Sequence, residues 1–282
     1  MTIGVSTYSF MQAVNDGRLD AYGVIDAAAR LGFAYIDIAA FRTDEPILQA
    51  APKIRQRAKD AGVKIYNYAV GADILLDGVA LTVGKLKPEL DAAAAMGAET
   101  FRSDASAGFR KDEKRQTPFL DALPEIADGY RQVTEYGQSL GVRTTIENHG
   151  YYSQDSERVE AIIRTVGHPN FGSLLDIGNF ACADEDSVQA VARLLPYAFH
   201  VHAKDFHIKP SHAENPGRGW FRSRSGRYLR GAVIGHGDIP AAACLKMIKD
   251  SGYDGVCAIE FEGIEDCLMA IEEGKANLAK LL

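Results

Sequence analysis

Short apolar segments alternate with longer amphipathic segments from one end of the chain to the other. The short segments read as strands, whereas the longer ones repeat their apolar residues with the period of an α-helix. The predicted strands are Ile3–Ser6, Tyr35–Ile38, Lys64–Ala69, Thr100–Ser103, Thr144–Glu147, Ser173–Ile177, His200–Lys204 and Val256–Phe261. The predicted helices are Ala21–Leu31, Pro46–Ala61, Thr82–Met96, Leu120–Leu140, Ser156–Val166, Ser187–Leu195, Ala241–Ser251 and Glu265–Leu282.

Several of these helices end in a glycine that precedes the next strand, as Gly62 and Gly97 do. Glycine tolerates the left-handed conformation that closes a helix C-terminus. Strands joined through helices of this length run parallel. Eight repeats in 282 residues predict an α/β fold with a parallel (β/α)8 TIM barrel, one domain over residues 1–282. The alternative is an open doubly wound sheet, but no Gly-x-Gly-x-x-Gly motif for a dinucleotide follows the first strand.

The segment Phe206–Val233 interrupts this alternation, because it is long, polar and rich in glycine and proline. Structureless segments of this length are usually functional or disordered. We expect it to close over a substrate or to form a subunit contact in a homo-oligomer; the alternative is a solvated loop. One acidic residue, Glu214, accompanies its basic residues, which are Lys209, Arg218, Arg222, Arg224, Arg227 and Arg230.

Net charge and composition narrow the set of partners. The formal charge of −7 makes the chain a poor partner for nucleic acid, whose phosphates need local cations. The four cysteines show no CxxC spacing, so neither a zinc ribbon nor a redox dithiol is expected. The chain has neither an apolar run of about 18 residues nor a signal-peptide pattern. We therefore expect a cytoplasmic protein that acts on a small molecule.

Polar residues that can bind metals follow four consecutive predicted strands. They lie in Thr144–Gly150, Leu174–Asn179, His200–Asp205 and Ala258–Gly263. A lone carboxylate at a strand end is usually a cap or an ion-pair partner, but parallel barrel strands bring four such ends together. Clustered carboxylates without a cation would raise each other's pKa. Carboxylates with an imidazole therefore predict one divalent metal ion, Mn²⁺, Zn²⁺, Co²⁺ or Mg²⁺.

The runs IENHG, LLDIGN, HVHAKD and IEFEG, with IGHGDIP at Ile234–Pro240, resemble the xylose isomerase-like TIM barrel family. Its sugar phosphate isomerase/epimerase group includes ketose 3-epimerases and inosose dehydratases, with endonuclease IV a more distant member. The resemblance is strongest from Val142 to Gly263. It implies that the metal ligands are Glu147, Asp176, His202 and Glu260, and that Glu147 and Glu260 also form the catalytic acid–base pair.

The resemblance implies a metal-dependent isomerase or epimerase for a monosaccharide or sugar phosphate. The metal would polarise a carbonyl and acidify the adjacent C–H, while one glutamate removes a proton and the other returns one. The first alternative is an inosose-type dehydratase with the same metal site, and the second is a non-catalytic sugar-binding barrel. An abasic-site endonuclease would need further metal ligands and a basic groove.

Further polar residues near these motifs are candidates for substrate binding. Asn179 stands where several epimerases carry a substrate-contacting histidine, which argues against a ketose 3-epimerase. His200 faces the same way as His202, and we expect it to pack inside the barrel. Arginine matches a phosphate or carboxylate because its planar fork donates two parallel hydrogen bonds. The predicted substrate-binding residues are His149, Asn179, Lys204, Asp205, Arg218, Arg222, Arg224 and His236.

Overall fold

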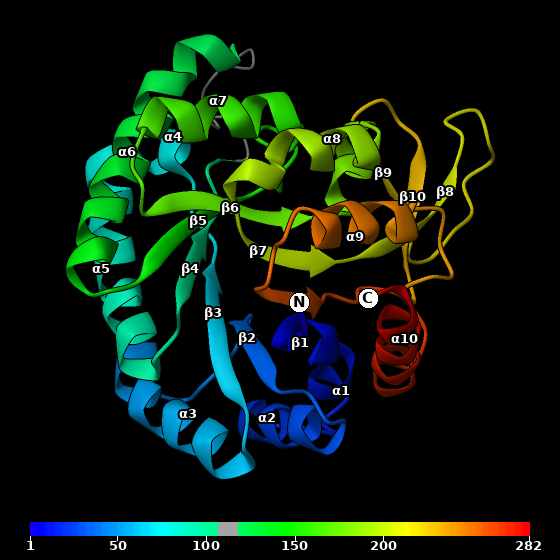
Figure 1. The fold of residues 1–282 in the computed structure, drawn as a ribbon, viewed down its shortest axis with the longest axis horizontal. Helices are drawn as coiled ribbons and strands as arrows, with labels where there is room; N and C mark the ends of the chain where they lie inside the picture. The colour runs from blue at the N-terminus through cyan, green and yellow to red at the C-terminus, as the bar shows by residue number, and fades with distance from the viewer. Residues whose placement is uncertain (107–117) are drawn as a thin grey trace.

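In the computed structural model, which describes residues 1–106 and 118–282, eight parallel strands close into a barrel (Figure 1). Their order around the barrel is β1–β11–β7–β6–β5–β4–β3–β2. The structure therefore confirms the predicted α/β barrel, and each predicted strand overlaps an observed one. The strands are β1 (Thr2–Ser6), β2 (Tyr35–Ala39), β3 (Lys64–Val70), β4 (Thr100–Ser103), β5 (Arg143–Glu147), β6 (Phe171–Asp176), β7 (Ala198–Ala203) and β11 (Val256–Ile259).

Helices surround the barrel and match the predicted ones closely (Figure 1). The long helices are α2 (Ala21–Arg30), α3 (Ile47–Ala61), α5 (Val79–Met96), α6 (Phe119–Ser139), α7 (Ser156–Val166), α8 (Ser187–Leu194), α9 (Ala241–Asp250) and α10 (Cys267–Leu281). Shorter pieces have too few residues to show a helical period. They are η1 (Thr7–Phe10), α1 (Met11–Asn15), α4 (Ile74–Asp77), η2 (Asn179–Ala183) and η3 (Leu195–Tyr197).

Local sequence signals define where several helices begin and end. The carboxylates of Asp20 and Asp155 accept hydrogen bonds from backbone N–H groups in the first turns of α2 and α7. A cap of this kind typically contributes about 1 kcal/mol. Gly62 and Gly97 close α3 and α5 with φ of 76° and 80°, values that glycine adopts without steric cost. These signals therefore set the boundaries of the helices that cover the strands.

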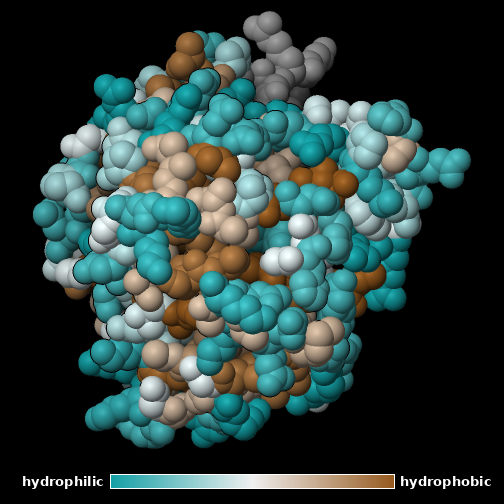
Figure 2. Space-filling model, turned by 45° about the vertical axis from the view of Figure 1, so that its right-hand side comes forward, coloured by the Kyte–Doolittle hydropathy of each residue, from teal (hydrophilic) through white to brown (hydrophobic). Residues whose placement is uncertain are grey.

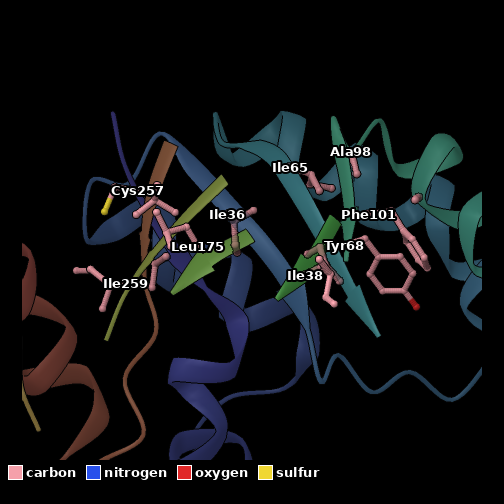
Figure 3. Close-up of a cluster of buried hydrophobic side chains, with 14 of the residues drawn as sticks. Ile36, Ile38, Ile65, Tyr68, Ala98, Phe101, Leu175, Cys257 and Ile259 are labelled. Carbon is pink, nitrogen blue, oxygen red and sulfur yellow. The ribbon is translucent and has the colours of Figure 1, made fainter. Parts of the chain in front are cut away.

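Alternate residues along each strand face opposite sides of the barrel wall. Most outward side chains are apolar and pack under the helices in one large core (Figure 3). This core includes Ile36, Phe101 and Ile259, none of which is accessible to solvent. Their sequence neighbours Asp37 and Arg102 are buried as well, although both are charged. Buried charges need partners, and the candidate site supplies these partners.

The segment after β7 differs from the prediction. It forms an antiparallel sheet of β8 (Asp205–Lys209), β10 (Tyr228–Ala232) and β9 (Phe221–Arg222), which lies beside α9 (Figure 1). Phe206, Leu229 and Ile239 belong to a small separate core beneath it. The expectation of a loop without secondary structure was therefore wrong. β9 has only two residues, and β8 and β10 mix charged with apolar residues and are not joined through helices, so the pattern that identified the barrel strands is absent here.

Most of the surface seen in Figure 2 is hydrophilic, with apolar side chains in patches between polar ones. All four cysteines are buried and free, as expected for small apolar core residues. Within residues 1–106 and 118–282, no helix is both long enough and apolar enough to cross a membrane.

Candidate metal centre

Four side chains meet at the C-terminal ends of β5, β6, β7 and β11. They are Glu147, Asp176, His202 and Glu260, and the ligand atoms that they offer all lie within 4.8 Å of one another. At most 12% of any of these side chains is exposed. The structure thus brings together the four residues that the sequence motifs singled out, because each faces inward on its own strand.

Each of the two glutamates has one oxygen bound to a basic side chain and the other directed to a shared centre. Glu147 Oε2 lies 2.5 Å from the guanidinium of Arg102, and Glu260 Oε2 lies 2.8 Å from Lys204 Nζ. The remaining oxygens, Oε1 in both residues, lie 3.7 and 3.6 Å from His202 Nδ1. The basic side chains therefore hold the carboxylates in place without covering the centre.

Asp176 also has one carboxylate oxygen held by hydrogen bonds, but its donors are backbone N–H groups. Its Oδ1 accepts hydrogen bonds from the N–H groups of Gly178 (2.8 Å) and Asn179 (3.0 Å). Its Oδ2 and the Nδ1 of His202 are buried and form no hydrogen bond with any described residue. Buried polar atoms of this kind call for a ligand. Oxygen donors with one imidazole suit a divalent cation, so these four residues fit the predicted metal ion.

A second set of buried residues orients His202. Asp37 Oδ2 on β2 lies 2.8 Å from His202 Nε2 and 2.6 Å from His200 Nε2. A histidine that donates its Nε2–H to a carboxylate presents Nδ1 as a metal ligand. His200 is packed inside the barrel, as expected, and its ring lies 4.8 Å from that of Tyr66. Sequence analysis missed Asp37, although this residue interrupts an apolar strand at a position whose side chain faces into the barrel.

The electrostatics of the cluster also favour a cation. Burial raises the pKa of Asp176 to about 6; Lys204 opposes this shift and Glu147 adds to it. Although burial opposes ionisation, Arg102 holds the pKa of Glu147 well below its usual value, and Lys204 does the same for Glu260. Two fixed negative charges thus make a third one unfavourable. A divalent ion would remove this repulsion.

A cavity of about 360 Å³ opens above the four residues. Arg102 and His149 form part of its wall. Asp104 lies outside the wall and contacts both of them. Asp104 Oδ1 lies 2.7 Å from Arg102 and 2.8 Å from His149 Nδ1. The predicted candidate His149 therefore reaches the cavity, held by a carboxylate. Sequence analysis missed Arg102 and Asp104, although this charged pair directly follows the apolar part of β4.

Of the other predicted substrate-binding residues, Lys204 borders the cavity, whereas Asn179 lies outside its wall and contacts two residues that form it. The Asn179 amide donates to Glu147 Oε1 at 3.1 Å and accepts from Lys204 Nζ at 3.1 Å. Asp205 points elsewhere, because its carboxylate accepts backbone hydrogen bonds from residues 206, 235, 237 and 239. His236 lies in this bound loop, exposed and outside the cavity wall.

The three predicted arginines lie apart from one another. The guanidinium of Arg222 stacks over the Tyr228 ring at 3.7 Å, and Arg224 pairs with Asp155 at 2.8 Å. Both groups fasten the three-stranded sheet, and neither borders the cavity beside the four candidate metal ligands. Arg218 borders a neighbouring cavity.

Family comparison agrees with this geometry. The family described as Xylose isomerase-like TIM barrel matches residues 25–281, and the chain belongs to it. The resemblance seen in the sequence motifs is thereby confirmed. Among curated proteins, the uncharacterized protein MJ1311 of Methanocaldococcus jannaschii is 23% identical over 192 residues. The match covers 62% of this chain and 59% of that protein, so the chain spans about three fifths of its relative's length.

Several solved structures have the same fold. D-psicose 3-epimerase in the presence of D-fructose has a TM-score of 0.74 at 17% identity, covering 100% of this chain and 99% of its own. The probable 3-DHS dehydratase AsbF of Bacillus anthracis, involved in petrobactin synthesis, has 0.73 at 18%, covering 99% of both chains. The IOLI protein with a zinc atom has 0.74 at 15%, covering 100% and 98%. At such identities the likeness shows the fold alone.

Proposed function

We propose that this protein is a metal-dependent isomerase or epimerase of a monosaccharide or its phosphate. The observation that carries the proposal is the pair Glu147 and Glu260, each with one oxygen at the same buried centre. The pair comes from β5 and from the end of β11, which are separated in the barrel by β6 and β7. Two carboxylates at one centre provide a base and an acid for one substrate carbon.

A divalent ion held by Glu147, Asp176, His202 and Glu260 would polarise the substrate carbonyl and so acidify the adjacent C–H. The protein's own groups do the remaining work. Glu147 and Glu260 are ionised, because their basic neighbours hold the pKa of each below its usual value even though burial opposes this. One ionised glutamate accepts the substrate proton, and the other takes up a proton from solvent before it returns one to the same carbon.

Buried positive charge would stabilise the reacting substrate. Arg102 and Lys204 both border the cavity and are almost completely buried. Negative charge that develops on a substrate oxygen during proton removal is stabilised by such fixed charges, since they need no reorganisation. His149, held by Asp104, can donate or accept a hydrogen bond at a substrate hydroxyl.

Family membership supports the same class of chemistry. The psicose epimerase has this fold over its full length, and the IOLI protein has it with a zinc atom. A dehydratase is the second candidate, favoured by Lys204, a buried ammonium 2.8 Å from Glu260 that could protonate a leaving hydroxyl. The probable dehydratase AsbF has the same fold. Product mass separates the two, because an epimer keeps the substrate's mass and a dehydrated product has lost water.

Conservative substitution of the two glutamates tests the proposal. Glu147→Gln and Glu260→Gln should each lower turnover by on the order of 10²–10⁴, because each removes one proton-transfer group. Exchange of the substrate C–H with solvent deuterium should fall in parallel. Metal content, measured by elemental analysis, separates lost chemistry from lost metal. Glu135→Gln, on the exposed face of α6, is the matched control. Undiminished deuterium exchange in both site variants would contradict the proposal.

A further inference from the structure

A second cavity of about 370 Å³ adjoins the one above the metal ligands. Tyr8 and Glu262 border both cavities, so the two lie side by side. Ligand pockets span roughly 300 to 1,000 Å³, and the first cavity alone already falls in that range. A single sugar ring at the metal centre would leave the second cavity free.

Tertiary contacts hold this second cavity in shape. Arg218, in the segment between β8 and β9, contributes to its wall. Gly219 has φ +83°, and a Cβ there would lie 2.5 Å from Ile264 Cγ2. Arg230 on β10 pairs with Glu265 at 3.2 Å. These two contacts fasten the three-stranded sheet to the connection between β11 and α10, and place Arg218 at the cavity.

The walls combine apolar surfaces with free polar groups. Phe261 and Met11 form apolar parts of the wall, and Tyr8 stands at the junction with 39% of its surface exposed. The side chains of Asn15 and Arg218 form no hydrogen bond or ion pair with any other described residue. Apolar walls with a few free polar groups are typical of small-molecule sites. A sugar ring matches them, since it has an apolar C–H face and a rim of hydroxyls.

The charges in the wall argue against a phosphate in this cavity. Asp16 and Glu262 carry two negative charges there, whereas Arg218 carries one positive charge. Arg18 lies 3.5 Å from Asp16, but it also pairs with Asp266 at 2.7 Å. Lys204 also lies 3.7 Å from Glu262, so both carboxylates have basic neighbours outside the wall. A phosphate dianion in the cavity would meet Arg218 as its cation with two carboxylates beside it, which weakens the attraction. An uncharged hydroxyl group meets no such penalty, and both carboxylates can accept its hydrogen bonds.

We propose that the second cavity is a subsite for an uncharged second sugar ring, linked to the sugar that reacts at the metal centre. The substrate is then a glycosylated sugar and not a sugar phosphate. Tyr8, at the boundary of the two cavities, lies beside the linkage between the rings. This inference rests on the proposed function, because it takes the first ring to be bound above the metal ligands.

Three ligands that share one ketose test the subsite by calorimetry on the Mn²⁺-loaded protein. They are D-fructose, D-fructose 6-phosphate and isomaltulose, which carries a glucose on O6 of fructose. We expect isomaltulose to bind roughly tenfold more tightly than fructose, which corresponds to about 1.4 kcal/mol of added contacts. Fructose 6-phosphate should bind no more tightly than fructose.

A variant that fills the subsite completes the test. Asn15 is exposed at the end of α1, so Asn15→Trp should fold while its ring occupies the cavity. It should abolish the advantage of isomaltulose and leave fructose binding unchanged. Gln138→Trp, exposed on α6 and outside the cavity, is the control and should change neither. Equal affinities of fructose and isomaltulose, or tighter binding of the phosphate, would overturn the subsite alone. Failure of all three ligands to bind would overturn a ketose at the metal centre and the subsite that rests on it, whereas the glutamate variants test the proposed function separately.

Discussion

The two faces of the barrel wall differ in what they bury, although they share the same strands. On β4, Phe101 faces outward and packs beside Tyr68 with ring centroids 5.9 Å apart. Its neighbour Arg102 faces inward between Asp104 and Glu147. Burial of the ring is favourable in itself. Burial of the ions costs desolvation energy that their attraction must offset. The outward face therefore supplies stability, and the inward face holds a charged site that the outward face stabilises.

The largest expected effect comes from the outward face. Phe101→Ala should lower the free energy of unfolding by about 3–5 kcal/mol, because it removes a fully buried ring and leaves a cavity. Urea unfolding measures the loss. The affinity of the folded protein for Mn²⁺ should stay near that of the parent chain, since the ring does not face the metal ligands. A loss under about 1 kcal/mol would show that the outward face contributes less than we infer.

A smaller effect is expected from the inward face, and on a different property. Asp37→Asn should weaken metal binding by about 10–100-fold, because it removes the carboxylate that orients His202 and raises its basicity. Calorimetric titration with Mn²⁺ measures the change. Asp91→Asn is the matched control, since Asp91 accepts a hydrogen bond from the Tyr136 hydroxyl outside the barrel. An unchanged Mn²⁺ affinity for the Asp37 variant would remove Asp37 from the metal centre.

Alanine substitutions at two glycines, one in the extra sheet and one in an outer helix, extend the comparison between regions. A Cβ at Gly231 on β10 would lie 2.6 Å from the backbone oxygen of Glu262, which borders both cavities. Gly231→Ala should therefore destabilise the fold by about 1–3 kcal/mol. At Gly84, within α5, a Cβ would meet no heavy atom of the described residues within 4 Å. Gly84→Ala should stabilise the protein by about 0.5–1 kcal/mol. Thermal unfolding of both variants checks the pair, and shifts of the same sign would contradict it.

Local periodicity explains why so much of the fold could be predicted. Each segment shows its own strand or helix periodicity, so the barrel strands and the long helices could be predicted one by one. The resemblance of the strand-end motifs to a known family also pointed to Glu147, Asp176, His202 and Glu260, which the structure brings together. The small sheet after β7 was missed, because its strands are short and pair through contacts that no single segment reveals.

The sequence by itself determined the order of strands and helices, because that order depends on periods of two and 3.6 residues within one segment. Its motifs also pointed to the four predicted ligands, through their resemblance to a known family. Tertiary structure alone decided that Asp37 on β2 meets His202 on β7, 165 residues away. It also decided that Arg102 pairs with Glu147, and that Arg218 borders a second cavity. Such contacts depend on how the strands stagger and tilt when the barrel closes, and that geometry is a property of all the strands together.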